Sequence, residues 1–364
     1  MKKTYINKYE SYSCAGDTKS LMKAIYSNKS FVAIDTTFMP ENPVALGKMG
    51  VDDFFETLSH TVAKVLESSN LKDFSNTLLI IGSSVGGMAE SEQHYFKDKH
   101  YKNIDPSRHA ISVISKSLEE KFSFLDTRSL STACTSSANA MLLAKRLIGV
   151  GAYDNVLVVG ADALCYTTVC GFYALSVLSS KPCTPFSKGR EGMNVAEAVA
   201  VLLLQNTPED GAVELLGVGA SSDAFHMTNP DPQAKGAISS MQNALDDAGL
   251  QAEDIVYVNA HGTGTVANDT VEGLAVETLF KDVYLSSTKA VTGHTLGASS
   301  ALEAIISCEV IKQSMIPPQV ALSEVENEKL IIPREAVKKV VPYVMSNSFA
   351  FGGNNTSLVF GGVK

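Results

Sequence analysis

The segment SLSTACTSSANAMLLAKRL, residues 129–147, decides the expected fold of this chain. It starts as a strand-like stretch, passes through a turn of small residues and continues as a helical pattern whose apolar residues, from Met141 to Leu147, share one face. Cys134 lies in the turn, just ahead of the helix. There, unpaired N–H groups and the positive end of the helix dipole favour a thiolate near neutral pH. We therefore predict that Cys134 is a nucleophile for covalent acyl chemistry.

The chain has six cysteines, and those other than Cys134 are interpreted as small apolar filler, because free cysteine is among the most often buried residue types. They are Cys14, Cys165, Cys170, Cys183 and Cys308. Their irregular spacing without a CxxC pair argues against a zinc site or a disulfide framework. It fits a reducing compartment. We therefore expect no metal and a cytoplasmic location, and the start of the chain does not match a secretory signal.

Two histidines lie in segments typical of sites rather than of cores. His261 follows the apolar run IVYV in a Gly/Thr turn, and the carboxyl end of a strand is where α/β sheets bind ligands. His294 lies between Gly293 and Gly297, just ahead of a helical pattern. Either histidine alone would be interpreted as an ordinary core or surface residue. Together with Cys134 they predict a Cys-His-His constellation.

Short apolar strands alternate with helical stretches, which indicates a layered α/β fold. The predicted strands are LLIIGSS (78–84), NVLVVGADA (155–163), AVAVLLLQN (198–206), VELLGVGASS (213–222), IVYVNAHG (255–262), VYLSSTK (283–289) and SLVFGG (357–362). A polar break at 206–212 separates two halves, each with its own strand, candidate catalytic residue and following helix. We predict one half over 1–208, which carries Cys134, and another over 209–364, which carries both histidines.

Four ordered motifs, TACTSSANA, VNAHGTGT, SSTKAVTGHTLGA and NSFAFGGNN, resemble the β-ketoacyl-acyl-carrier-protein synthases, in particular their elongating Cys-His-His branch. The similarity also includes TPFSKGREGMNVAEAVAVLLL, SSDAFHMTNP and IPPQ, and covers the chain from about Leu78 to its end. The resemblance implies a five-layered αβαβα thiolase-like fold made of two similar halves. Ala350 stands where the family usually has a glycine, and Met193 where an aromatic residue is common.

The resemblance also implies a mechanism. Cys134 would accept an acyl chain from the phosphopantetheine thioester of an acyl carrier protein, after which His261 and His294 would stabilise the enolate formed when a malonyl thioester loses carbon dioxide. The carbanion would attack the acyl group and elongate it by two carbons. By the same match, the N–H groups of Cys134 and Phe351 would form an oxyanion hole, and Phe351 would gate the acyl pocket.

The remaining site residues are predicted as support. Lys289 and Glu303 are expected to form a buried pair that orients the histidines, because Lys289 ends an apolar-leaning strand and Glu303 interrupts an apolar helix. Three threonines resemble those that contact the phosphopantetheine arm: Thr228, Thr263 and Thr265. We expect no cofactor of the chain's own, since phosphopantetheine arrives on the carrier protein. The family implies a homodimer or a heterodimer with a related subunit.

Other functions also fit parts of the sequence. The chain could be a pocket-shaping subunit of a heterodimeric ketosynthase. Residues 82–86 satisfy the G-x-S-x-G pattern of serine hydrolases, with Ser84 as nucleophile, although such a match arises easily by chance. Residues 262–267 satisfy a relaxed dinucleotide fingerprint, but without a following βαβ unit and acidic ribose contact.

Composition limits the partners. At 364 residues with 45% hydrophobic content the chain can bury a large core, and its longest apolar run, from Ala198, is too short to span a bilayer. The basic residues neither cluster nor alternate with aromatic residues, so nucleic acid binding is not expected. The net charge of −9 would repel an acidic carrier protein, so docking requires a local basic patch. The candidates are Lys64, Lys102, Arg108, Lys116, Lys188 and Arg190.

Overall fold

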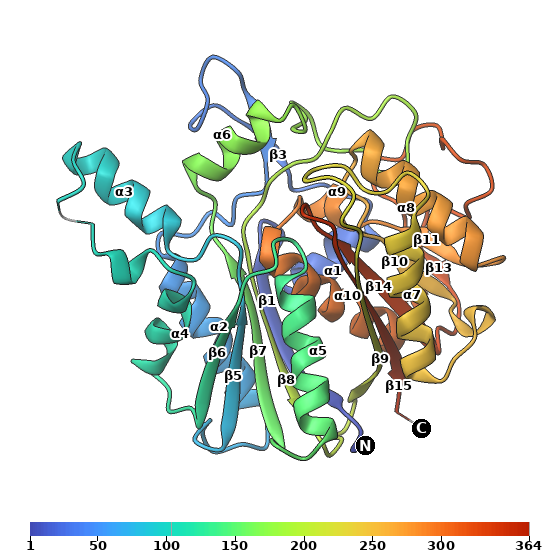
Figure 1. Ribbon diagram of the computed structural model, residues 1–364, viewed down its shortest axis with the longest axis horizontal. Helices are drawn as coiled ribbons and strands as arrows, with labels where there is room; N and C mark the ends of the chain where they lie inside the picture. Colours follow the sequence, from blue (N-terminus) through green and yellow to red (C-terminus); the bar gives the residue numbers. More distant parts are fainter. Residues whose placement is uncertain (103, 364) are drawn as a thin grey trace.

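Figure 1 shows the computed structural model, which describes residues 1–102 and 104–363. Within this part of the chain, an 11-stranded sheet runs through the molecule. Ten of its strands lie in the order β11 (Tyr284–Ser286), β10 (Tyr257–Asn259), β14 (Tyr343–Phe349), β15 (Asn354–Gly362), β9 (Val213–Ser222), β1 (Tyr5–Ser13), β8 (Ala198–Gln205), β7 (Asn155–Asp162), β5 (Thr77–Gly82) and β6 (Asp126–Leu130), and β2 (Gly16–Asp17) pairs with β1.

The same strand pairing occurs twice along the chain. β5 runs parallel to β6 and β7, and β7, β8 and β1 then follow with antiparallel pairing. In the second half, β10 runs parallel to β11 and β14, and β14, β15 and β9 follow with antiparallel pairing. The halves join where Tyr5 and Ile6 of β1 pair with Glu214 and Val213 of β9. Each half therefore presents the carboxyl ends of its parallel strands next to a following helix.

The helices complete a five-layered αβαβα arrangement, which confirms the predicted thiolase-like fold class. Two helices lie between the halves of the sheet and contact both: α5 (Ser136–Gly149) and α10 (Ser299–Gln313). The outer layers hold α2 (Phe54–Ser68) and α4 (Ser112–Glu119) on one side, and α7 (Lys235–Ala248) and α8 (Val266–Leu279) on the other. In Figure 1, α5 and α10 stand between these outer pairs.

Residue size explains why two helices fit between the sheets. The strands that cover them are continuous apolar runs, and every residue of β5 and β8 is buried. The packed helices are rich in alanine and serine. Glycine is required where they meet the sheet, because a Cβ on Gly82 would lie 2.5 Å from Cα of Ser137, and a Cβ on Gly160 would lie 2.8 Å from Cβ of Ala301.

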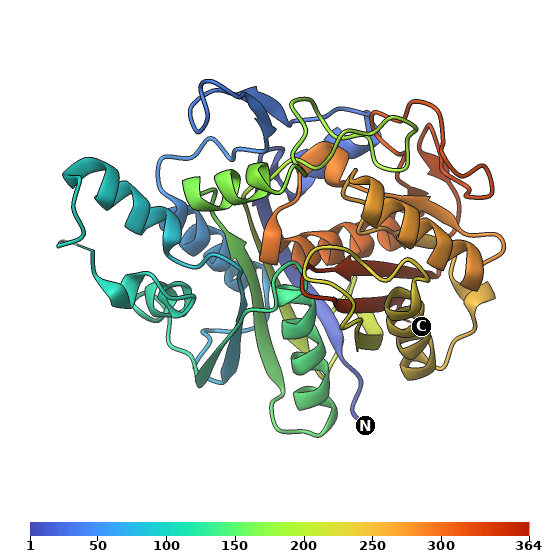
Figure 2. The ribbon, with the colours of Figure 1, turned by 45° about the horizontal axis from the view of Figure 1, so that its top comes forward.

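The remaining elements surround this core, as Figure 2 shows for α3 and α6. They are α1 (Thr18–Tyr26), β3 (Ala33–Asp35), β4 (Val44–Leu46), α3 (Met88–Asp98), η1 (Pro106–Arg108), α6 (Tyr166–Ala174), η2 (Ala252–Asp254), α9 (Lys289–Thr292), η3 (Leu296–Ala298), β12 (Met315–Ile316) and β13 (Val337–Lys338). All seven strands named in the sequence analysis overlap an observed strand, whereas β1 and β14 were not predicted. No helix of the described residues has the length and apolar character needed to cross a membrane.

Candidate active site

Each of the three predicted catalytic residues lies in a turn that directly precedes a helical segment. Cys134 lies between β6 and α5, directly after Ala133, which adopts a positive φ of 53°. His261 follows β10 and precedes α8, and His294 lies between α9 and α10. Because β5, β6, β10 and β11 are parallel strands of the two joined halves, their carboxyl ends bring these turns to one region. The geometry thus places the three residues in neighbouring turns.

The three side chains converge. The Cys134 sulfur and a ring nitrogen of each histidine all lie within 4.8 Å of one another. The imidazole rings of His261 and His294 meet edge to face, with centroids 5.1 Å apart and an interplanar angle of 86°. All three residues are buried, with at most 8% of their surface exposed. Such spacing allows one thioester group to contact the sulfur and both imidazoles.

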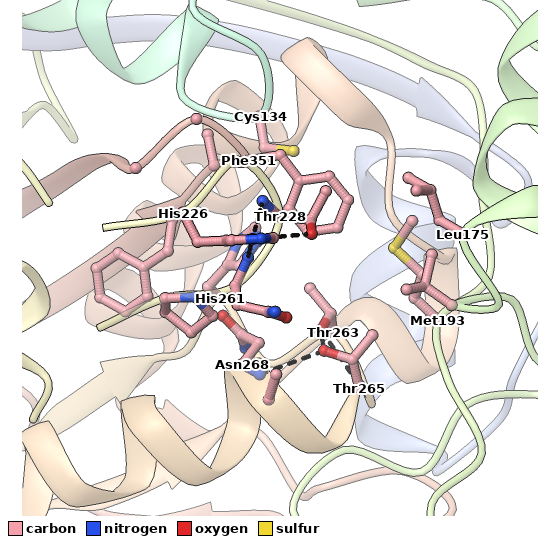
Figure 3. A pocket seen from close by; sticks show the side chains of 18 of the residues that line it. Cys134, Leu175, Met193, His226, Thr228, His261, Thr263, Thr265, Asn268 and Phe351 are labelled. Atoms are coloured by element: carbon pink, nitrogen blue, oxygen red, sulfur yellow. Dashed lines mark hydrogen bonds between the residues drawn. The ribbon is translucent and has the colours of Figure 1, made fainter. Parts of the chain in front are cut away.

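A cavity of about 290 Å³ leads to this cluster (Figure 3). Its walls include the three predicted threonines, Thr228, Thr263 and Thr265, together with Phe351. An apolar part is formed by Phe172, Leu175, Val177 and Met193. The cavity therefore combines hydroxyl groups with an apolar wall beside the sulfur, a composition suited to a ligand with a polar arm and a hydrocarbon chain.

The protonation of Cys134 differs from the expectation. Burial raises the pKa of the Cys134 thiol to about 11, although Lys289 and the backbone N–H of Phe351 act in the opposite direction. The predicted thiolate near neutral pH is therefore wrong for this state. The helix terminus cannot offset the desolvation of a sulfur that is almost fully enclosed. A proton acceptor is needed before this sulfur attacks.

The two histidines are suited to the neutral form. Burial lowers the pKa of both His261 and His294 well below the usual value, and the charge of Lys289 adds to the effect. The backbone N–H of Leu296 donates to Nδ1 of His294 across 3.1 Å, and the Ser299 hydroxyl lies 3.0 Å from the same nitrogen. Nδ1 of His261 is buried and has no hydrogen-bond partner among the described residues.

Lys289 and Glu303 form an ion pair beneath the histidines. Their side chains are only 2% and 3% exposed, so the predicted burial of both residues is confirmed. Burial raises the pKa of Glu303 to about 7, whereas the neighbouring Lys289 charge lowers it. Lys289 also lowers the pKa of Cys134 and of both histidines. The charge of Lys289 therefore affects the protonation of the cluster, although neither Lys289 nor Glu303 lines the cavity.

Sequence comparisons match nearly the whole chain to one family. Residues 12–210 match the beta-ketoacyl synthase N-terminal domain, and residues 212–323 match the beta-ketoacyl synthase C-terminal domain. The chain belongs to the beta-ketoacyl synthase family. The match begins well before Leu78, so the similarity extends further toward the amino terminus than the motifs alone suggested.

Individual relatives agree with this assignment. The chain is 33% identical over 304 residues to 3-oxoacyl-[acyl-carrier-protein] synthase 2 of Staphylococcus aureus, covering 77% of this chain and 75% of that protein. It is 34% identical over 314 residues to the synthase of the same name from Rhizobium meliloti, covering 79% and 74%. Among solved structures, the ketosynthase ApeO in complex with its chain length factor ApeC from Xenorhabdus doucetiae has a TM-score of 0.90 at 30% identity, covering 100% of this chain and 98% of that chain.

The loop between β14 and β15 brings Phe351 to the sulfur of this synthase. The backbone N–H of Phe351 hydrogen-bonds Cys134, and the ring of Phe351 lies 5.9 Å from that of Phe172. Gly352 and Gly353 take the positive φ values of the loop, 87° and 78°. Ala350 is not among the residues with a positive φ, so an alanine is accommodated where the family usually has a glycine.

The serine motif has a structural role in this synthase. The Ser84 hydroxyl donates to the backbone oxygen of Ala133 across 3.0 Å, and the Ser83 hydroxyl donates to Asp162 across 2.5 Å. Within the described part of the chain, neither serine hydroxyl donates to a histidine. The hydroxyl of Ser84 therefore supports the turn before Cys134 rather than forming a hydrolase nucleophile.

The glycine-rich turn after β10 is held by acidic side chains that the sequence analysis did not single out. The N–H groups of His261 and Gly262 donate to Glu272 across 2.8 and 2.7 Å, and that of Gly264 donates to Asp269. A dinucleotide phosphate would need such N–H groups free. The relaxed fingerprint is therefore not a phosphate site. Burial raises the pKa of Glu272 to about 7.

Three of the basic docking candidates form ion pairs in the structure. Arg190 is buried, where it pairs with Asp269 and Glu326 and donates to Thr270, so it cannot contact a protein partner. Arg108 pairs with Glu90, and Lys188 pairs with Glu324 on the surface. The side chains of Lys64, Lys102 and Lys116 do not join the cavity wall. Arg190 instead fixes the start of α8 beside the His261 turn.

Proposed function

We propose that this chain catalyses a decarboxylative Claisen condensation between an acyl group on Cys134 and a malonyl group on an acyl carrier protein, elongating a fatty acyl, polyene or polyketide chain by two carbons. The observation that carries the proposal is the convergence of the Cys134 sulfur with His261 and His294 at the end of a partly apolar cavity. Family membership supports it. The 3-oxoacyl-[acyl-carrier-protein] synthase relatives are named for this type of reaction.

In the first step the sulfur of Cys134 attacks the acyl thioester of the carrier protein. Because the thiol is protonated at neutral pH, its proton passes to the neutral imidazole of His261 as the carbon–sulfur bond forms, since both nitrogens of His294 are already engaged as acceptor and donor. The N–H groups of Cys134 and Phe351 stabilise the tetrahedral oxyanion. When the intermediate collapses, the carrier thiol leaves with that proton and the acyl group remains on Cys134.

In the second step a malonyl thioester occupies the same cavity. His261 and His294 donate hydrogen bonds to its thioester oxygen, where negative charge develops as carbon dioxide leaves. Their low pKa keeps both rings neutral, and the acceptor role of Nδ1 in His294 leaves Nε2–H as the donor. The carbanion attacks the acyl carbonyl, the carbon–sulfur bond breaks, the β-ketoacyl product stays on the carrier protein, and the released Cys134 thiolate takes a proton from water.

The other residues act around these steps. Lys289 and Glu303 orient the histidines, the charge of Lys289 helps to keep the pKa of both rings low, and Phe351 gates the apolar wall. The hydroxyls of Thr228, Thr263 and Thr265 contact the phosphopantetheine arm from the cavity wall. Thr263 and Thr265 are already linked by a hydrogen bond of 2.9 Å, which fixes their relative orientation. We assign the first half to residues 1–208 and the second to 209–364.

The carrier protein, in its acyl and malonyl forms, is the proposed partner. Phosphopantetheine arrives on it, so the chain needs no cofactor or metal of its own. The chain would form a homodimer, or a heterodimer with a related ketosynthase-like subunit, as the ApeO ketosynthase does with its chain length factor. All six cysteines are free, which supports a cytoplasmic location.

Intact-protein mass spectrometry tests the proposal. The purified chain is mixed with a panel of acyl-carrier-protein thioesters, and the added mass is mapped to Cys134. Malonyl-carrier protein is then added and the condensation product is measured. Cys134→Ala is expected to abolish condensation and to retain decarboxylation of malonyl-carrier protein. Normal condensation by Cys134→Ala overturns the proposal, and an inactive wild-type chain that becomes active only with a related subunit indicates the pocket-shaping role.

A further inference from the structure

A buried carboxylate outside the cavity connects the two halves of the site. Asp162 ends β7 and is 0% exposed. Its two oxygens accept hydrogen bonds from the Ser83 hydroxyl and from the N–H groups of Ser84, Val85 and Gly297, at 2.5 to 3.0 Å. Every one of these groups is a donor. The contacts therefore match an ionised carboxylate, which has only acceptors.

One side of this network leads to Cys134. The Ser84 hydroxyl donates to the backbone oxygen of Ala133 across 3.0 Å, and Ala133 holds the positive φ that turns the chain into Cys134. The backbone N–H of Ser84 donates to Asp162, so the carboxylate is connected to the Cys134 turn through a single residue, Ser84. A positive φ at a residue other than glycine persists only where its surroundings hold it in place.

The other side leads to His294. Gly297, which donates to Asp162 across 2.6 Å, directly follows Leu296, whose N–H holds Nδ1 of His294. The two turns are packed without space between them, because a Cβ on Gly297 would lie 2.7 Å from the backbone nitrogen of Ser84. The carboxylate therefore joins the turn that supports the nucleophile to the turn that carries one histidine.

We propose that Asp162 is a positioning residue of the condensation reaction, which fixes the Cys134 turn of the first half against the His294 turn of the second. This inference rests on the proposed function. The charge of Asp162 has a second effect, since it raises the pKa of the Cys134 thiol. A neutral side chain at this position would loosen the spacing of the two turns and at the same time make the thiol more acidic.

The test compares three variants with the wild-type chain. Asp162→Asn keeps the size of the side chain but replaces one acceptor oxygen with an NH2 group, which is a donor and would face other donors. Ser84→Ala removes only the hydroxyl link to Ala133 and leaves the Ser84 N–H group on Asp162. Asp53→Asn is the matched control, because Asp53 also accepts a backbone N–H, from Glu56 across 2.9 Å, at the exposed start of α2.

The acylation rate and the malonyl decarboxylation rate are measured and divided by the amount of Cys134 thiol that can be alkylated. The pH dependence of alkylation by iodoacetamide is measured as well. Asp162→Asn is expected to slow both acylation and decarboxylation, each by on the order of 10²-fold, from a misplacement of about 1 Å. It is also expected to shift the alkylation profile to lower pH, because the charge of Asp162 raises the pKa of the Cys134 thiol. Ser84→Ala should slow acylation only, and Asp53→Asn should match the wild type.

Equal rates in Asp162→Asn and the wild type, or an alkylation profile that does not move to lower pH, overturn the inference. If Asp162→Asn fails to fold, Ser83→Ala decides, because it removes one donor and keeps the carboxylate. Slower acylation and decarboxylation in Ser83→Ala support the inference, and unchanged rates overturn it. A wild-type chain that accepts no acyl group contradicts the proposed function instead, and the alkylation profiles still report the effect of Asp162 on the thiol.

Discussion

The backbone N–H of Leu296 donates a hydrogen bond to Nδ1 of His294 across 3.1 Å. Because Nδ1 accepts this bond, the proton of the neutral imidazole is assigned to Nε2. Leu296 adopts a positive φ of 54° to place its N–H in this direction. A short stretch of strained backbone thus selects the tautomer that can donate to a substrate oxygen.

The role of His294 as a donor is tested by His294→Ala. Loss of one hydrogen bond to the developing enolate should slow decarboxylation of malonyl-carrier protein by about 10²–10³-fold. Acylation of Cys134 should be affected much less, because His261 remains beside the sulfur. Release of carbon dioxide and the mass of the acyl-enzyme give the two rates. The opposite pattern, with acylation lost and decarboxylation retained, would assign His294 the role of base instead.

The buried thiol predicts a particular pH profile. With the pKa of Cys134 raised to about 11, the thiolate fraction is small at pH 7 and rises about tenfold per pH unit up to that value. Alkylation of Cys134 by iodoacetamide, followed at the level of the peptide, should therefore keep rising between pH 7 and pH 10. A plateau near neutral pH would show that the helix terminus outweighs burial after all. Cys134→Ser is the control for alkylation at other cysteines.

Lys289→Met should change both stability and pH dependence. Removing one partner of a buried pair leaves Glu303 without its counter-charge, which typically destabilises a protein by about 3–5 kcal/mol. The charge of Lys289 lowers the pKa of both histidines, so its loss should raise these values and move the acid limb of the decarboxylation profile to higher pH.

Glu303→Gln in the same background provides the control for Lys289→Met. The double variant has no unpaired buried charge, so part of the lost unfolding free energy should return, while the histidine pKa values stay raised. Denaturant unfolding and the pH dependence of decarboxylation measure the two effects. A double variant less stable than Lys289→Met would contradict the interpretation of the pair.

The sequence predicted the catalytic cluster because its chemistry is local. Each of Cys134, His261 and His294 lies in a turn of small residues ahead of a helix, and four motifs placed these turns in the order of a known family. The burial of Lys289 and Glu303 was also predictable, since a charged residue in an apolar element has to be paired. Features that are determined by a residue's own segment could therefore be predicted from the sequence.

Features that depend on distant segments were not predictable. β1 has the sequence YINKYESYS, in which polar residues obscure a strand that lies in the middle of the sheet. The pKa of Cys134 is set by the residues that enclose it, including Phe351 from another half of the fold. The role of Asp162 is invisible in NVLVVGADA, because its donors come from Ser83–Val85 and from Gly297.

The environment of Arg190 also depends on distant segments. Its guanidinium is 1% exposed, pairs with the fully buried Asp269, and donates to the backbone oxygens of Thr265 and Val266. Arg190→Met should lower the unfolding free energy by about 3–5 kcal/mol, because Asp269 loses its buried counter-charge. It should also slow decarboxylation, since the start of α8 supports the His261 turn.

The salt dependence of KM for the carrier protein should remain that of the wild type in Arg190→Met, because a buried side chain makes no contact with a partner. Lys188→Met, at an exposed neighbour paired with Glu324, is the control and should leave stability nearly unchanged. A weaker salt dependence in Arg190→Met than in Lys188→Met would return Arg190 to the docking surface.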